Sequence, residues 1–191
     1  MSSDNMIRIA IADDHKIFRD GIKMALAGRP TLKMIWEAED GKDMMHKIAI
    51  KKPDVLLMDI RMPEIDGINA IQLLRKEYED VKIIVLTMYD DQQMISKMME
   101  MGANAYLTKT TDPDEIYDAI VTCMNDDFYF NELVNKAVLL KLQHKKTVRQ
   151  FYPNPVKFSE KELKILKLIL MLQTVSYLNL CSYTFFRLKY K

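Results

Sequence analysis

Hydrophobic and polar positions follow two different periods over the first 127 residues of the chain. Short, almost wholly apolar runs predict strands, and longer stretches with apolar residues every three or four positions predict helices. The predicted strands are Ile7–Ala12, Lys33–Trp36, Val55–Met58, Ile83–Leu86 and Ala105–Leu107. The predicted helices are Lys16–Ala27, Gly41–Lys51, Gly67–Glu79, Asp91–Met101 and Asp112–Asn125.

Start and stop residues support several of these helix ends. The first helix, which carries Ile17, Met24 and Leu26, is followed by the Gly-Arg-Pro sequence of residues 28–30, and Gly102 follows the fourth as a plausible C-cap. Asp112 precedes the fifth helix as an N-cap, with a proline next and a glutamate three residues on, as in a capping box.

The order of the predicted elements indicates the fold class. Strands that alternate with helices at this spacing form βαβ units, and right-handed crossovers give a parallel, doubly wound α/β sheet with helices on both faces. Val55–Met58 and Ile83–Leu86 are continuously apolar, as expected of strands that are buried on both faces. Ligands of such sheets bind outside the carboxyl ends of the strands.

Charged and hydroxyl side chains stand at those strand ends. Asp13 and Asp14 follow the first strand, Asp59 follows the third, Thr87 follows the fourth, and Lys109 comes after the fifth. Carboxylates gathered at one edge are suited to Mg²⁺, and a hydroxyl and an ammonium beside the cation are suited to phosphoryl oxygens. Because carboxylates can form aspartyl phosphates, Asp59 on the central strand is the candidate acceptor.

Four ordered motifs resemble one family. IADDH at residues 11–15, LMDIRMPEIDG at 57–67, Leu86-Thr87, and GANAYLTK at 102–109 resemble the receiver domain of two-component response regulators, with the NarL/FixJ subfamily the most similar in form. The resemblance covers roughly residues 5–127 and implies the flavodoxin-like fold, a five-stranded sheet of order 2-1-3-4-5.

The resemblance implies a phosphorylation site. Asp59 would accept the phosphoryl group of a phosphohistidine on a sensor histidine kinase. Together with Asp59, Asp13 and Asp14 would bind Mg²⁺, assisted by the backbone carbonyl of Arg61. Lys109 would pair with a phosphoryl oxygen. Chemistry would be limited to Mg²⁺-dependent self-phosphorylation and dephosphorylation, so the protein is not expected to be an enzyme in the usual sense.

The resemblance also implies a conformational switch. Thr87 would hydrogen-bond the phosphoryl group and shift inward, and Tyr106 would follow it; the alternative for Tyr106 is an ordinary half-buried strand aromatic.

Two residues depart from the family pattern. Met88 stands where receivers usually carry a small residue, so its side chain is expected to narrow access to Asp59. Thr110 replaces a proline found in many receivers.

Charge divides the chain into two parts. Residues 1–130 have a net charge of −8, and residues 131–191 have a net charge of +9. A basic appendage on an acidic body is typical of contact with nucleic acid, although a solvated lysine-rich helix face would give the same balance. Residues 128–157 are interpreted as a linker, with an amphipathic helix over Asn131–His144 and a proline-containing connection after it.

The segment 158–170 resembles the first helix of a LuxR-type helix-turn-helix domain, with a capping box formed by Ser159 and Glu162. The pattern stops after Ile169, and residues 171–191 show no recognisable domain. No recognition helix is visible, so the chain is not expected to bind DNA with sequence specificity. We interpret the abrupt change in composition after Ile169 as a truncation or frame disruption of the C-terminus.

Two other features concern the location of the protein. The 19 uncharged residues Leu168–Phe186 have the length of a bilayer span, but six polar side chains interrupt them, so spanning is disfavoured and no membrane partner is expected. Cys123 and Cys181 are too few and too far apart for a disulfide framework or a cysteine zinc site, and the N-terminus is unlike a signal peptide. A cytoplasmic location follows.

Three alternative functions are to be compared with the receiver resemblance. A phosphatase with an aspartate nucleophile needs a second Asp where this chain has Arg61, and a nucleotide-binding oxidoreductase needs clustered glycines, whereas the five glycines here are scattered. An interaction module that is never phosphorylated remains open. The leading hypothesis is a response regulator phosphorylated on Asp59, with an incomplete DNA-binding domain, and it is compatible with a homodimer.

Overall fold

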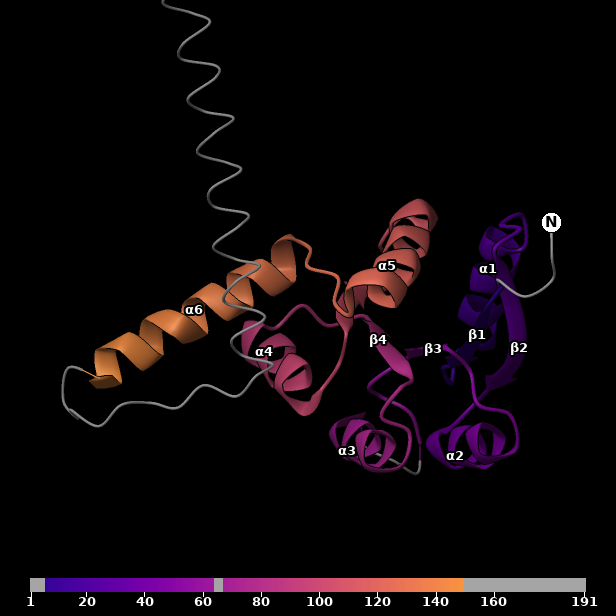
Figure 1. Ribbon diagram of the computed structural model, residues 1–191, viewed down its shortest axis with the longest axis horizontal. Coiled ribbons are helices and arrows are strands. Elements are labelled where there is room, and N and C mark those ends of the chain that lie inside the picture. The colour runs from indigo at the N-terminus through magenta and orange to yellow at the C-terminus, as the bar shows by residue number, and fades with distance from the viewer. Residues whose placement is uncertain (1–5, 64–66, 150–191) are drawn as a thin grey trace, which may run out of the picture. The chain divides into compact units, whose positions relative to one another are not determined.

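A computed structural model describes residues 6–63 and 67–149 of the chain, which form a parallel sheet of order β2-β1-β3-β4-β5 with helices on both faces (Figure 1). The strands are β1 (Ile7–Ala12), β2 (Leu32–Ala38), β3 (Val55–Met58), β4 (Lys82–Thr87) and β5 (Ala105–Thr108). The helices are α1 (Lys16–Leu26), α2 (Gly41–Ile50), α3 (Gly67–Glu77), α4 (Gln92–Met101), α5 (Pro113–Asp126) and α6 (Glu132–Arg149). The predicted fold class and strand order are confirmed.

The central strand β3 is buried on both sides, as its continuous apolar sequence predicts. Val55 and Leu57 pack into one hydrophobic cluster, and Leu56 and Met58 pack into the other, because successive side chains of a strand point to opposite faces. All four side chains are at most 1% exposed. This strand therefore joins the two cores and fixes the position of the residue that follows it.

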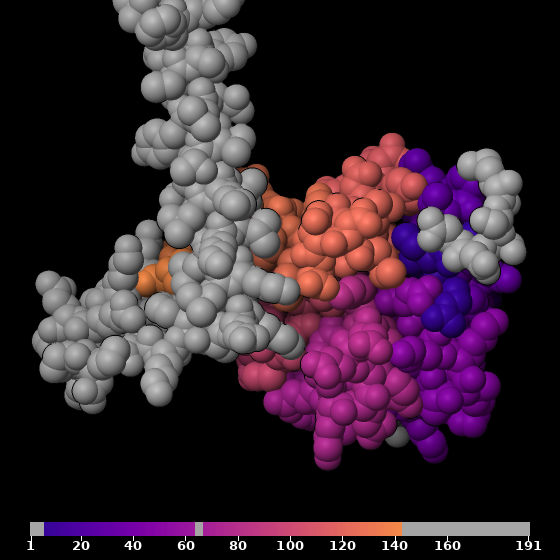
Figure 2. Space-filling model, in the orientation of Figure 1, coloured from indigo at the N-terminus to yellow at the C-terminus, as the bar shows by residue number. Residues whose placement is uncertain are grey.

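Helices α1 and α5 cover one face of the sheet. Their side chains pack with β1, β3, β4 and β5 in a single cluster, and atoms of α5 lie beside those of the N-terminal elements in the space-filling view (Figure 2). The buried residues of α1 are Arg19, Ile22 and Leu26, whereas Ile17 and Met24 are 89% and 80% exposed. Two of the apolar residues noted in this helix therefore face away from the core.

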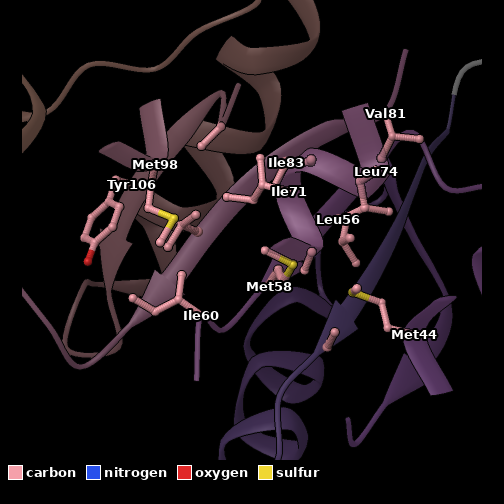
Figure 3. Packing of buried hydrophobic residues seen from close by; sticks show 14 of the residues in the cluster. Met44, Leu56, Met58, Ile60, Ile71, Leu74, Val81, Ile83, Met98 and Tyr106 are labelled. Carbon is pink, nitrogen blue, oxygen red and sulfur yellow. The ribbon is translucent and has the colours of Figure 1, made fainter. Parts of the chain in front are cut away.

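Helices α2, α3 and α4 cover the opposite face (Figure 1). Met98 and Met99 of α4 are buried in this cluster, where the flexible methionine side chain can fill irregular gaps in the packing. Figure 3 shows Met98 beside Tyr106 at one end of the cluster, with Met44 near the other end. The side chain of Tyr106 is fully buried, so it differs from the half-buried strand aromatic that was the alternative.

The boundaries of the five strands and of α1 to α5 agree with the sequence pattern to within two residues. Strand β2 is longer than predicted because its pairing with β1 continues from Leu32 to Ala38. Gly102 ends α4 with a left-handed φ of 109°, as a C-cap glycine does. Asp112 caps α5, but its carboxylate accepts from the backbone N–H of Asp114 rather than from that of residue 115.

Helix α6 begins one residue later than predicted and ends at Arg149 rather than His144. Its first half belongs to the same compact unit as the sheet, a unit that ends at Leu142. Val134 and Ala137 are 0% and 2% exposed in the cluster that contains α4. The proposed helix at 158–170, the tail at 171–191 and Leu168–Phe186 lie outside the described residues. Among the described helices, none has the length and apolar character required to cross a bilayer.

Two glycines make a matched test of the packing. A Cβ on Gly67 would lie 2.6 Å from the Cα and the carbonyl oxygen of Ile60, whereas a Cβ on Gly21 in α1 would meet nothing within 4 Å. We expect Gly67→Ala to lower the free energy of unfolding by about 1–3 kcal/mol because backbone must move. We expect Gly21→Ala to raise it by about 0.4–1 kcal/mol by restricting the unfolded chain. Urea unfolding measures both, and equal effects would contradict this packing.

Candidate functional site

Strand register brings two carboxylates together at the carboxyl edge of the sheet. Ala12 at the end of β1 pairs with Met58 at the end of β3, and the backbone N–H of Asp59 donates to the Ala12 carbonyl over 2.9 Å. Asp13 and Asp59 therefore follow adjacent strands at the same level. They are only 1% and 4% exposed, so water does little to screen the repulsion between them.

Lys109 offsets part of the negative charge of this pair. Its backbone N–H donates to the Thr87 carbonyl over 2.7 Å, which extends the alignment of β5 with β4. Its Nζ lies 2.6 Å from Asp13 Oδ2 and 2.6 Å from Asp59 Oδ2. Burial by itself would lower the pKa of Lys109, but the hydrogen bonds to Asp13 and Asp59 outweigh burial and raise that pKa above its ordinary value. The ammonium group stays charged between the two acids.

Asp14 and His15 complete a cluster of four ligating side chains. One ligand atom from each of Asp13, Asp14, His15 and Asp59 lies within 4.8 Å of the others. The carboxylates are the oxygen ligands that Mg²⁺ prefers, and Asp14 is 35% exposed at the rim, where bound water has access. The residues present therefore fit a magnesium ion, with Asp13, Asp14 and Asp59 as the candidates to hold it.

Thr87 ends β4 with an unusual hydroxyl. The residue is fully buried, and its Oγ1 has no hydrogen-bond partner within the described part of the chain. A buried hydroxyl without a partner costs free energy, and such groups call for an explanation such as a ligand. This geometry leaves the Thr87 hydroxyl available to an incoming acceptor at the carboxyl edge.

Arg61 lies close to Asp59 through its backbone rather than through its charge. The backbone N–H of Arg61 donates to Asp59 Oδ1 over 3.2 Å, while its guanidinium group lies over the ring of Tyr89, 4.3 Å from the centroid. The cationic head is thus directed to an aromatic ring of the β4–α4 loop.

Tyr106 connects this edge of the sheet with two other elements. Its hydroxyl donates to the Tyr89 carbonyl over 2.9 Å, and its own carbonyl accepts from Asn131 Nδ2 over 3.0 Å. The Asn131 side chain also accepts from the backbone N–H of Val134 and so caps α6. Burial, with a smaller contribution from the charge of Asp59, raises the pKa of Tyr106 well above its ordinary value, so the phenol is neutral.

Arg19 is a site residue that the sequence analysis missed. Its guanidinium Nη1 donates to the Asp13 carbonyl over 2.6 Å, and its Nε pairs with Glu37 of β2 over 3.3 Å. The side chain is only 8% exposed, so a buried cation holds the backbone of one acid in place. The available signal was its position: Arg19 shares a helix face with Ile22 and Leu26 at spacings of three and seven residues.

The chain matches a known family. The response regulator receiver domain family matches residues 9–121, a range that begins within β1, includes β2 to β5 and contains every strand-end residue described above. A solved two-component response regulator of the LuxR family from Aurantimonas sp. SI85-9A1 superposes with a TM-score of 0.67 at 27% identity. The match covers 72% of this chain and 99% of that one.

Two curated relatives extend the comparison. The response regulator UvrY of Escherichia coli (strain K12) is 32% identical over 172 residues, covering 90% of this chain and 77% of UvrY. The transcriptional regulatory protein DegU of Brevibacillus brevis is 34% identical over 137 residues, covering 72% of this chain. The chain spans 58% of the length of DegU.

Removing the central ammonium group tests the charge balance of the site. Lys109→Met leaves two buried carboxylates without their shared cation, and we expect a loss of about 3–5 kcal/mol in the free energy of unfolding in metal-free buffer. Lys16→Met is the matched control, because Lys16 pairs with Asp20 at the surface and its loss is expected to cost about 0–1 kcal/mol. Similar losses in the two variants would contradict the role assigned to Lys109.

Proposed function

Because the chain belongs to the response regulator receiver domain family, and to the NarL/LuxR type of two-component response regulators, we propose that it receives a phosphoryl group on Asp59. The observation that carries this proposal is the Asp13–Lys109–Asp59 arrangement, in which one nearly buried carboxylate is held beside a second acid and an ammonium group.

The proposed reaction is a displacement at phosphorus. A carboxylate oxygen of Asp59 attacks the phosphorus of a phosphohistidine, a P–O bond forms, the P–N bond breaks, and the imidazole nitrogen leaves with the electron pair. Positioning and charge neutralisation are what this chemistry needs from a protein. Asp59 is held at the end of a rigid, buried strand, and Lys109 is placed to pair with a phosphoryl oxygen after transfer.

A bound Mg²⁺ would supply positive charge next to the phosphoryl oxygens. Asp13, Asp14 and Asp59, with the backbone carbonyl of Arg61, are the groups proposed to hold it. Arg19 keeps the Asp13 backbone in place, which supports a fixed ligand position. The family membership and the cluster of acids support the cofactor assignment.

Thr87 and Tyr106 are proposed as the switch. The Thr87 hydroxyl, which has no partner among the described residues, would donate to a phosphoryl oxygen and move inward. Tyr106 is hydrogen-bonded to the β4–α4 loop at its hydroxyl and to Asn131 at its carbonyl, so a shift of that loop would reach the cap of α6. The fully buried position of Tyr106 supports this assignment over a passive strand residue.

The proposed partner is a sensor histidine kinase, as receiver domains act with such kinases, and the proposed location is the cytoplasm. The proposed chemistry is limited to phosphorylation of the aspartate and its later dephosphorylation, so the chain would act as a phosphoacceptor rather than as a conventional enzyme. Self-association as a homodimer is compatible with this function.

The acceptor assignment predicts the outcome of one substitution. Asp59→Asn removes the oxygen nucleophile, so we expect no gain of a phosphoryl group when the variant is incubated with a small phosphodonor and Mg²⁺. Asp80→Asn, at a side chain 87% exposed on the surface, is expected to be phosphorylated like the unaltered protein. Intact mass spectrometry measures both, and a full phosphoryl shift in Asp59→Asn would place the acceptor elsewhere.

The DNA-binding part of the proposal rests on the sequence after Ile169, where the helix-turn-helix pattern is lost. Sequence is read by side chains that reach base edges from a recognition helix, and the 191 residues show no pattern for such a helix. The +9 charge of residues 131–191 is suited to phosphate contacts. We propose that the chain contacts DNA through phosphates alone.

Competition between a promoter fragment and random DNA tests this part of the proposal. We expect weak binding that ignores sequence and falls steeply with salt, with and without phosphorylation, because each phosphate contact releases a counterion. A preference of about 10³-fold or more for one sequence is typical of specific binders and would contradict the proposal.

A further inference from the structure

We propose that His15 is a ligand in the acidic site, so that the site binds a first-row transition-metal ion more tightly than Mg²⁺. The inference rests on the proposed metal site and adds an imidazole to its oxygen ligands.

The imidazole of His15 is directed at the carboxylates. Its Nδ1 lies 2.6 Å from Asp14 Oδ1 and 3.2 Å from Asp13 Oδ1. Its backbone N–H donates to Asp13 Oδ1 over 2.8 Å, and the residue is the N-cap position of α1, so the main chain at this point is fixed. The ring is 66% exposed, which leaves it free to adjust to a metal without disturbing the core.

A positive group already occupies the space between these atoms. Lys109 Nζ lies 2.6 Å from carboxylate oxygens of Asp13 and Asp59, and 3.4 Å from His15 Nδ1. The carboxylate oxygens of Asp13 and Asp14 only accept, so in this arrangement Nδ1 carries the proton that it donates to Asp14. A metal ion between these atoms would take the place of that proton and bind the lone pair of Nδ1. Asp13, Asp59 and the proton-bearing face of His15 therefore already converge on one region of the site.

The type of ligand decides which metal is preferred. Mg²⁺ takes oxygen ligands and gains little from an imidazole, whereas cobalt, nickel and zinc bind imidazole well. Affinity for a mixed site of oxygen and nitrogen rises along the first-row series beyond manganese. A site with His15 as a ligand should therefore discriminate between Co²⁺ and Mg²⁺, while a site of carboxylates alone should not depend on His15 for either ion.

Calorimetric titration of the full chain with Co²⁺ and with Mg²⁺ separates these cases. For the unaltered protein we expect Co²⁺ to bind more tightly than Mg²⁺. His15→Gln should lower the Co²⁺ affinity about 10-fold or more, as loss of a metal contact does, and should change the Mg²⁺ affinity by less than about twofold, because Mg²⁺ does not depend on the ring. His46→Gln makes the same change at an exposed position of α2 and should alter neither affinity.

A spectroscopic signature tests ligation directly. Co²⁺ is paramagnetic, so ring protons of a ligating histidine should appear far outside the ordinary range of the ¹H NMR spectrum and should be lost in His15→Gln. If His15→Gln lowers the Co²⁺ and Mg²⁺ affinities equally, or if the Co²⁺-bound protein shows no shifted ring protons, the proposal is overturned and His15 is only a hydrogen-bond partner of Asp14. If the protein binds Mg²⁺ and its affinity for Co²⁺ is no higher, the role of His15 as a ligand is wrong while the proposed magnesium site stands. If neither ion binds, the metal site of the proposed function fails as well.

Discussion

The repulsion between two nearly buried carboxylates is the constraint on which the rest of the site depends. Asp13 and Asp59 follow adjacent strands of a parallel sheet, so the register of β1 and β3 forces them together. The chain compensates with Lys109, which follows the last strand at the same edge, and with Arg19, whose guanidinium group donates to the backbone carbonyl of Asp13. A site that gathers negative charge and retains only one ammonium between its acids is suited to a further cation and to a phosphoryl group.

The carboxyl edge of the sheet is also connected to α6, through hydrogen bonds of Tyr106 and Asn131. Tyr106 is buried in the cluster on the α4 face, and its two polar ends are bonded to the β4–α4 loop and to Asn131. Asn131 in turn caps α6, whose Val134 packs in the same cluster. The helix that leaves the sheet is thus attached to the strand next to the site by hydrogen bonds and by apolar packing. A change at the carboxyl edge has a short physical route to it.

The strands of the sheet and the residues at the strand ends could be predicted from the sequence because local patterns determine them. Apolar runs placed the five strands, their order followed from the family resemblance, and the strand-end acids and Lys109 followed from the strands. Arg19 and Asn131 were not recognised as parts of the site, because their roles depend on contacts between elements far apart in the chain. The sequence also did not predict that Ile17 and Met24 are exposed. The buried face of α1 contains Arg19 together with Ile22 and Leu26, and apolar periodicity alone does not indicate a face that includes an arginine.

If the clustered acids hold the Mg²⁺ that serves phosphoryl transfer to Asp59, calorimetric titration should distinguish the unaltered chain from the double variant with Asp13→Asn and Asp14→Asn. Loss of two of the three carboxylates should abolish measurable Mg²⁺ binding while the sheet stays folded, as circular dichroism would confirm. Unchanged Mg²⁺ affinity in a folded double variant would contradict the account.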